Sequence, residues 1–63
     1  MEDQMIQSKI EKAVKASKDY GICYLLSNGK TLDTAVTAEM KAYLIERGYW
    51  VAAIYEHGHQ VEA

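Results

Sequence analysis

The sequence predicts an α+β fold with the element order α-β-(β)-α-β-(β), in which a small sheet carries two helices packed on one face. Three observations lead to this prediction. Apolar residues recur at helical spacing near the start of the chain. A second helical segment ends at a glycine and runs directly into an aromatic strand. Two glycine-containing turn signals each follow a strand-like run. With 63 residues and no proline, the chain is predicted to be a single domain, 1–63.

The first helix is expected over residues 3–18. Its apolar residues recur at i, i+4, i+7, i+8 and i+11 and therefore form one stripe: Ile6, Ile10, Ala13, Val14 and Ser17. Glu11 and Lys15 are spaced for an ion pair across one helical turn. Gly21 is expected to end the helix, because glycine readily adopts the left-handed conformation of a helix C-terminus.

A strand is expected next, over Ile22–Leu26, and it leads into the turn sequence Ser27-Asn28-Gly29-Lys30. Asn-Gly favours a two-residue type I′ hairpin turn, which needs a positive φ at both positions. A short return strand is therefore predicted over residues 30–32.

Thr37 is expected to cap the second helix, with Glu39 in its first turn, and Gly48 is expected to follow its last residue. Four residues are predicted to share one face of this helix: Met40, Tyr43, Leu44 and Arg47. The strand Tyr49–Tyr55 then carries no charge, which predicts a central strand buried on both faces. His57-Gly58 is predicted to turn the chain into a short edge strand over residues 59–62.

The pattern leaves the strand directions open. A parallel crossover between the two main strands and a purely antiparallel sheet both fit it. With both helices on one face, the other face is expected to stay uncovered and to form an association surface. Its expected residues are Tyr20, Cys23, Tyr24, Leu25, Trp50 and Ile54.

Composition excludes several classes of function. A formal net charge of −2, with only seven Lys and Arg residues, argues against binding to nucleic acid or to an anionic membrane. No apolar run approaches the ~18 residues of a membrane-spanning helix. The lone cysteine and the acidic start of the chain lead us to expect a cytoplasmic protein.

Few residues suggest chemistry. Cys23 lies mid-strand without a basic neighbour and is expected to be a small buried hydrophobe. His57 and His59 are weak metal-ligand candidates whose alternative is an exposed turn. Lys30 follows Asn28-Gly29 without the upstream glycine of a phosphate-binding loop. No nucleophile–base set or carboxylate pair stands out, so neither an enzyme nor a cofactor is expected.

The aromatic residues are more informative. Tyr and Trp on strands pack cores, anchor protein interfaces or stack on bases, and base stacking also requires interleaved basic residues, which both strands lack. The predicted interface residues are Tyr20, Tyr24, Tyr49, Trp50 and Tyr55.

The segment Met40–Val51, with its leucine-containing helix followed by Gly-Tyr-Trp-Val, resembles small uncharacterised accessory proteins of tailed bacteriophages. The resemblance spans about Ile10 to Val61 and is one of helix-strand-helix-strand pattern. It implies a phage accessory protein in the host cytoplasm that acts as an oligomer and binds a host protein or a small molecule. It transfers no active-site residue, and many such proteins end with a further aromatic strand that this chain lacks.

The sequence therefore predicts a non-enzymatic interaction protein that forms a homo-oligomer and binds a protein partner. An alternative is an oligomeric protein that binds or sequesters a nucleotide-like anion at a subunit interface, with Lys30, Arg47 and aromatic residues as contacts. A third is a metal-binding protein that uses His57 and His59.

Overall fold

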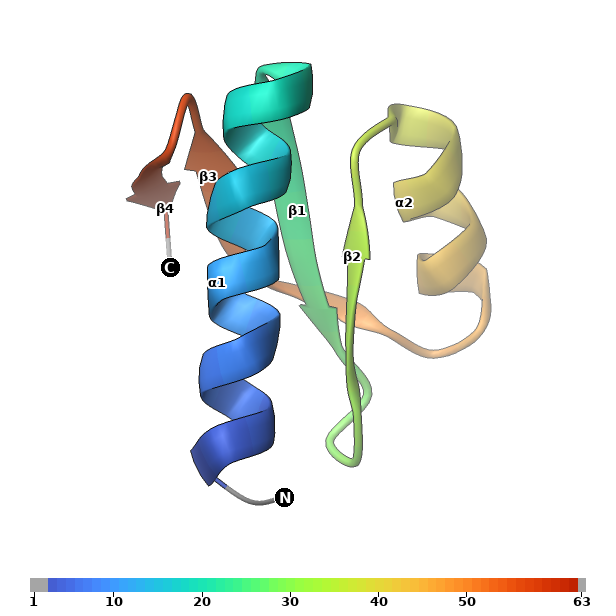
Figure 1. Ribbon diagram of the computed structural model, residues 1–63. Coiled ribbons are helices and arrows are strands. Elements are labelled where there is room, and N and C mark those ends of the chain that lie inside the picture. Colours follow the sequence, from blue (N-terminus) through green and yellow to red (C-terminus); the bar gives the residue numbers. More distant parts are fainter. Residues whose placement is uncertain (1–2, 63) are drawn as a thin grey trace.

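The computed structural model of the protein describes residues 3–62, which form two helices and four strands (Figure 1). In chain order these elements are α1 (Asp3–Tyr20), β1 (Ile22–Ser27), β2 (Leu32–Ala35), α2 (Ala38–Glu46), β3 (Trp50–Glu56) and β4 (His59–Glu62). The predicted α+β class and the order α-β-β-α-β-β are confirmed, and β4 has its predicted bounds. The predicted bounds of the first return strand, 30–32, are wrong, because a four-residue loop precedes β2 and the strand begins at Leu32. Neither α1 nor α2 is long and apolar enough to cross a membrane.

The four strands form one sheet in the order β2-β1-β3-β4. Each neighbouring pair is antiparallel, so the parallel crossover that the sequence left open does not occur. The predicted inner position of β3 is confirmed, because β3 pairs with β1 on one side and with β4 on the other. The edges of the sheet are the two short strands, β2 and β4.

Helix α1 follows its predicted stripe. Ala13 and Ser17 are fully buried, and Ile10 and Val14 are partly buried beside them. The helix runs two residues further than expected and stops before Gly21, whose φ is +91°. The predicted Glu11–Lys15 ion pair is wrong, because Lys15 Nζ instead lies 3.2 Å from an Asp19 carboxylate oxygen one turn further on.

The two hairpins have different turns, and only the second has the turn that its sequence predicts. Between β1 and β2 the loop has four residues, 28–31, and only its glycine has a positive φ, so the predicted two-residue type I′ turn is wrong. The Asn28 side chain accepts hydrogen bonds from the Lys30 and Thr31 backbone N–H groups and holds the longer loop. Between β3 and β4, His57 (φ +50°) and Gly58 (φ +87°) form the tight two-residue turn.

Local signals set the limits of α2. The Thr37 hydroxyl oxygen accepts the Met40 backbone N–H at 3.1 Å, as predicted for an N-cap. Gly48, with φ +95°, follows the C-cap residue Arg47 and turns the chain into β3. Of the four residues predicted to share a face, only Leu44 is buried.

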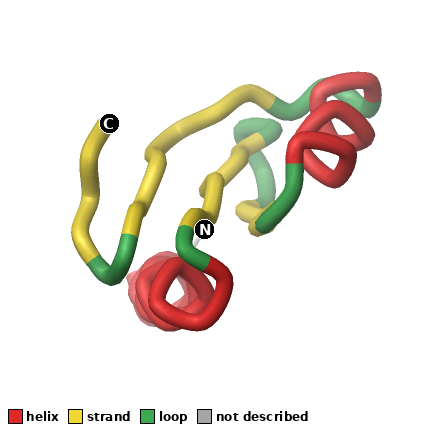
Figure 2. The backbone as a smooth tube through the Cα atoms, turned by 90° about the horizontal axis from the view of Figure 1, so that it is seen from above, coloured by secondary structure: helices red, strands yellow, loops and turns green. Residues whose placement is uncertain are grey.

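The helices lie on opposite faces of the sheet, and the expectation that both cover one face is wrong (Figure 2). Cys23 and Leu25 of β1 face the cluster that contains the α1 residue Ala13. The alternate residues Tyr24 and Leu26 face the cluster that contains Leu44 of α2. Since successive side chains of a strand point to opposite faces, α1 and α2 sandwich β1. We call these two faces the α1-side face and the α2-side face.

The predicted uncovered face is therefore split. Cys23 and Leu25 are buried beneath α1, whereas Tyr24 pairs with Ile54 on the α2-side face. The expectation that β3 is buried on both faces is also wrong, because only Ala53 and Tyr55 of this strand are buried. Strand β3 thus follows the one-sided pattern typical of an antiparallel sheet.

Candidate interaction surfaces

The five predicted interface aromatics do not form one surface. Tyr55 is buried in the core under α1. Tyr20, 69% exposed, lies at the end of α1, whereas Tyr24 is half-buried on the α2-side face with Lys41 Nζ 4.7 Å from its ring centroid. Tyr55 is thus a core residue, and the ring of Tyr24 makes a cation–π contact within the chain.

Tyr49 and Trp50 lie near the β1–β2 loop. The Tyr49 hydroxyl is 3.2 Å from the Thr31 hydroxyl, which ties the start of β3 to that loop. Trp50 is 53% exposed, and a Cβ atom at Gly29 would lie 3.5 Å from its ring. Trp50 is therefore an exposed aromatic residue that lies beside the β1–β2 loop, and it is not part of the core.

The two candidate anion-binding residues are separated. Lys30 lines a small hollow with Lys9 and Met5, between the β1–β2 loop and α1. Arg47 lies over the Tyr43 ring, 5.3 Å from its centroid. Within the described residues the two side chains thus have different surroundings, and the predicted anion site at a subunit interface stays a prediction.

His57 and His59 lie at the β3–β4 turn rather than on one extended strand. His57 has a positive φ and donates its backbone N–H to the Gly21 carbonyl oxygen at 3.2 Å, while His59 is exposed and pairs with Glu56. The structure therefore shows the exposed turn that the sequence offered as the alternative to a metal site. Among residues 3–62, no three His, Cys, Asp or Glu side chains gather closely enough to hold a metal ion.

Cys23 is confirmed as a small buried residue. It has no exposed surface, and its thiol donates weakly to the Tyr24 carbonyl oxygen at a distance of 3.7 Å. Burial raises the pKa of the Cys23 thiol, against smaller opposing effects of a hydrogen bond with the Ala35 backbone and of the Lys12 charge. A thiol whose ionised form is disfavoured is a poor nucleophile.

Ser17 joins two parts of the fold, a role that the sequence did not predict. The sequence placed Ser17 only in the apolar stripe of the first helix. Its hydroxyl donates to the Val14 carbonyl at 2.7 Å and accepts the Gly58 backbone N–H at 2.8 Å. This buried hydroxyl fastens the β3–β4 turn to α1. The signal in the sequence was a hydroxyl at a buried helical position, where a polar group needs a partner.

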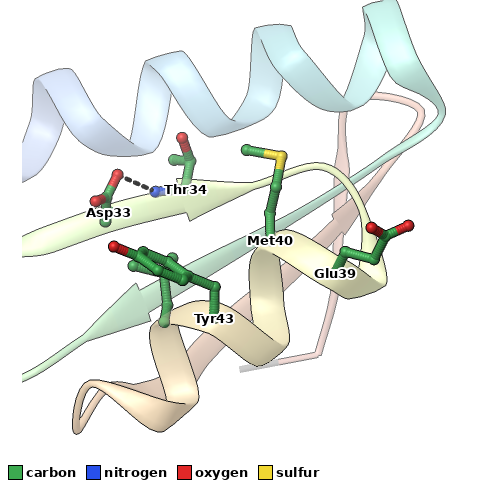
Figure 3. A pocket seen from close by; sticks show the side chains of 6 residues that line it. Asp33, Thr34, Glu39, Met40 and Tyr43 are labelled. Carbon is green, nitrogen blue, oxygen red and sulfur yellow. Dashed lines mark hydrogen bonds between the residues drawn. The ribbon is translucent and has the colours of Figure 1, made fainter.

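A groove lies between edge strand β2 and helix α2 (Figure 3). It has a volume of about 390 Å³ and is mainly apolar. We call it the β2–α2 groove, and its lining residues are Asp33, Thr34, Glu39, Met40, Tyr43 and Leu44.

The β2–α2 groove follows the free edge of the sheet. Asp33 pairs with Leu26 and Thr34 pairs with Leu25, so the two residues point to opposite faces, and both line the groove. Met40 and Tyr43 project from α2 toward β2 in Figure 3, and they are 45% and 57% exposed. Large exposed apolar side chains along a concave edge are typical of a binding groove.

A second surface is the half of the α2-side face formed by β3 and β4, which we call the open half. Helix α2 lies at the β2 end of this face, and within residues 3–62 no helix lies over β3 and β4 on this side (Figure 2). A hollow of about 200 Å³ along β3 and β4 is lined by Val51, Ala53, Ile54 and Glu62. Of these, Ile54 and Glu62 pair with each other on the open half. Ala53 belongs to the cluster under α1, whereas Val51 packs beside the cluster that contains Leu44. The floor of the open half is an apolar strip of β3.

Comparisons with protein-family models, with curated proteins and with solved structures find no match. What defines the chain is therefore its own geometry. It is a small α+β fold whose described residues include the open half and the β2–α2 groove as candidate interaction surfaces, and among these residues no cluster of metal-ligating side chains occurs.

Proposed function

We propose that this chain is a non-enzymatic interaction protein that self-associates and binds a protein partner. The observation that carries the proposal is the open half, where no helix among residues 3–62 covers the apolar strip around the half-buried Ile54. Covering such a strip removes apolar surface from water at roughly 25 cal/mol per Å². The resemblance to phage accessory proteins, and with it a host-cell setting, remains a prediction of the sequence.

The small core gives a second reason for self-association. Eight hydrophobic residues are buried among those described, and three of them are alanines: Ala13, Cys23, Leu25, Leu26, Ala35, Leu44, Ala53 and Tyr55. A domain of about 60 residues buries only about 60% of the surface of its unfolded chain, which leaves its stability marginal. Burying the open half against a second copy would add apolar burial that the single chain lacks.

The open half is suited to a copy of itself because it is a sheet face with an apolar centre and a charged margin. Ile54 lies centrally on β3 and pairs with Glu62 of edge strand β4. A two-fold axis through the strip would place Ile54 against Ile54 of a second chain and leave Glu62 at the solvated rim, as expected for a dimer interface.

Size-exclusion chromatography with light scattering tests self-association. The wild-type protein is expected at a multiple of its 7.1 kDa chain mass, and Ile54→Lys, which puts a charge on the open half, is expected at the chain mass. Gln60→Lys is the matched control. It adds the same positive charge to β4 at a residue that pairs with Tyr55 on the α1-side face, away from the open half. Wild-type protein that elutes as a single chain at high micromolar concentration contradicts the proposed self-association.

A further inference from the structure

The free edge of β2 carries an unusual backbone contact. The Thr34 N–H donates to a carboxylate oxygen of Asp33, its own neighbour, at 2.9 Å (Figure 3). An N–H that donates to a side chain is outside the ladder with β1, so it lies on the free edge. Asp33 thereby occupies the position at which the carbonyl group of an added strand would bind.

The β2–α2 groove provides the rest of a strand-binding site. An extended peptide that pairs with β2 would lie between this strand and α2, and its alternate side chains would face α2. Those side chains would meet Met40, Tyr43 and Leu44. Main-chain hydrogen bonds to an exposed edge give affinity in this mode of recognition, and the pockets for alternate side chains give specificity.

The charges at the groove select the peptide. Asp33 on β2 and Glu39 in the first turn of α2 are two carboxylates that line the same groove, and the Lys15–Asp19 ion pair given by the structure lies elsewhere, on α1. Arg47 Cζ lies 5.3 Å from the ring centroid of Tyr43, which lines the groove, and Lys41 Nζ lies 4.7 Å from the ring centroid of Tyr24. Neither cation is among the residues that line the groove. The groove itself is thus acidic around an apolar floor, which favours a basic ligand.

We infer that the β2–α2 groove binds an extended peptide segment of a partner protein, with a Lys or Arg between two apolar residues at alternate positions, by strand addition to β2. The inference rests on the partner-binding part of the proposed function and adds the site and the chemistry of the partner. On binding, a peptide carbonyl takes over the Thr34 N–H from Asp33. The Asp33 carboxylate that is released then pairs with the peptide's basic side chain. Asp33 thus exchanges its hydrogen bond with the Thr34 N–H for an ion pair with the peptide.

The test is a titration of ¹⁵N-labelled protein with the heptapeptide Ser-Val-Thr-Lys-Thr-Val-Ser, blocked at both ends, followed by amide chemical shifts. Shift changes are expected in β2 and α2, and replacing the peptide's Lys by Glu is expected to abolish them. No shift change at millimolar peptide, or changes centred on another part of the sheet, overturns the inference.

Protein variants test the groove residues. Asp33→Asn and Glu39→Gln keep the polar shape, and each is expected to weaken binding about two- to fivefold, the range of exposed ion pairs. Glu46→Gln, at the end of the same helix and outside the groove, is the charge control. Tyr43→Ala is expected to weaken binding and Ile45→Ala, similarly exposed on α2, to leave it unchanged. Equal effects of groove and control variants overturn the inference.

Peptide backbone methylation tests strand addition directly. Only alternate amides of an added strand bond to β2, so N-methylation at Lys and at the adjacent Thr must have unequal effects. Equal effects mean that the peptide does not pair as a strand. Light scattering of Tyr43→Ala separates this inference from self-association: an unchanged oligomer is expected, whereas dissociation would show that a second copy fills the groove and would overturn the inference. A peptide that does not bind an oligomeric wild-type protein leaves the proposed self-association standing.

Discussion

Replacing Ser17 by alanine removes a single buried hydroxyl that joins residues 41 positions apart. The Gly58 N–H then loses its acceptor inside the protein, which costs about 1–3 kcal/mol for a buried donor. Alanine is the better helix former by roughly 0.5 kcal/mol, which offsets part of this cost. We therefore expect Ser17→Ala to lower the free energy of unfolding by about 0.5–2.5 kcal/mol.

That loss is large for this chain. At roughly 0.05–0.15 kcal/mol per residue, a domain of this length has a total stability of about 3–9 kcal/mol. The assay is urea unfolding followed by circular dichroism, at one fixed protein concentration because self-association changes the apparent stability. The midpoint is expected to fall while the slope with urea stays unchanged.

Ser8→Ala is the matched control, because Ser8 is exposed on the same helix. It makes the same change in helix propensity without the hydrogen bond and is expected to raise stability slightly. The difference between the two variants therefore isolates the contribution of the Ser17–Gly58 contact. If Ser17→Ala is as stable as Ser8→Ala, the reasoning about this buried hydroxyl is refuted.

Three further predictions concern the core and the α2–β3 junction. Leu26→Ala is expected to cost about 2–5 kcal/mol in urea unfolding, since Leu26 is fully buried; a loss below that of Ser17→Ala would contradict this. Gly48→Ala is expected to cost about 1 kcal/mol through its left-handed conformation alone, because no atom lies within 4 Å of the added Cβ, and an unchanged midpoint would count against it. Burial raises the Cys23 thiol pKa above its usual 9.0, so the folded state keeps the proton that the unfolded state loses. The stability advantage of wild type over Cys23→Ala should therefore be full below about pH 9 and shrink as pH rises further, and a growing advantage would show the opposite sign.

The parts of the fold that the sequence predicts well have local causes. Thr37 caps α2, and Gly21 and Gly48 end the helices in the left-handed region, so each signal is contained in a few neighbouring residues. The tight turn at His57 and Gly58 is local in the same sense. Residues whose conformation depends on their own neighbours can be assigned without knowing the fold.

The placement of the helices could not be predicted in this way. The run Ile22–Leu26 is apolar at every position, so its two faces look alike in the sequence, and the alternation that separates Leu25 from Leu26 acquires meaning only when both faces are covered. At Asn28, a side chain that accepts two backbone N–H groups outweighed the type I′ preference of Asn-Gly.

The β2–α2 groove was not predicted at all. Asp33, Thr34 and Glu39 show no shared motif, and they meet only because α2 packs on the β2 end of the sheet. The predicted aromatics were chosen by residue type, which does not distinguish the buried Tyr55 from the exposed Tyr20. The aromatic residue types thus led us to expect an interaction surface, but the position of such a surface depends on how the helices pack on the sheet.

The burial of a single α2 residue, Leu44, has a consequence for motion. Detaching α2 breaks one small cluster and leaves α1 packed on the other face of β1, so this helix is expected to open without global unfolding. Backbone amides of α2 should then exchange with deuterium much faster than those of β1 and β3, and a bound peptide should slow them. Equal exchange rates in α2 and β1 would show that the domain opens only as one unit. The groove wall would in that case be a fixed feature rather than a hinged one.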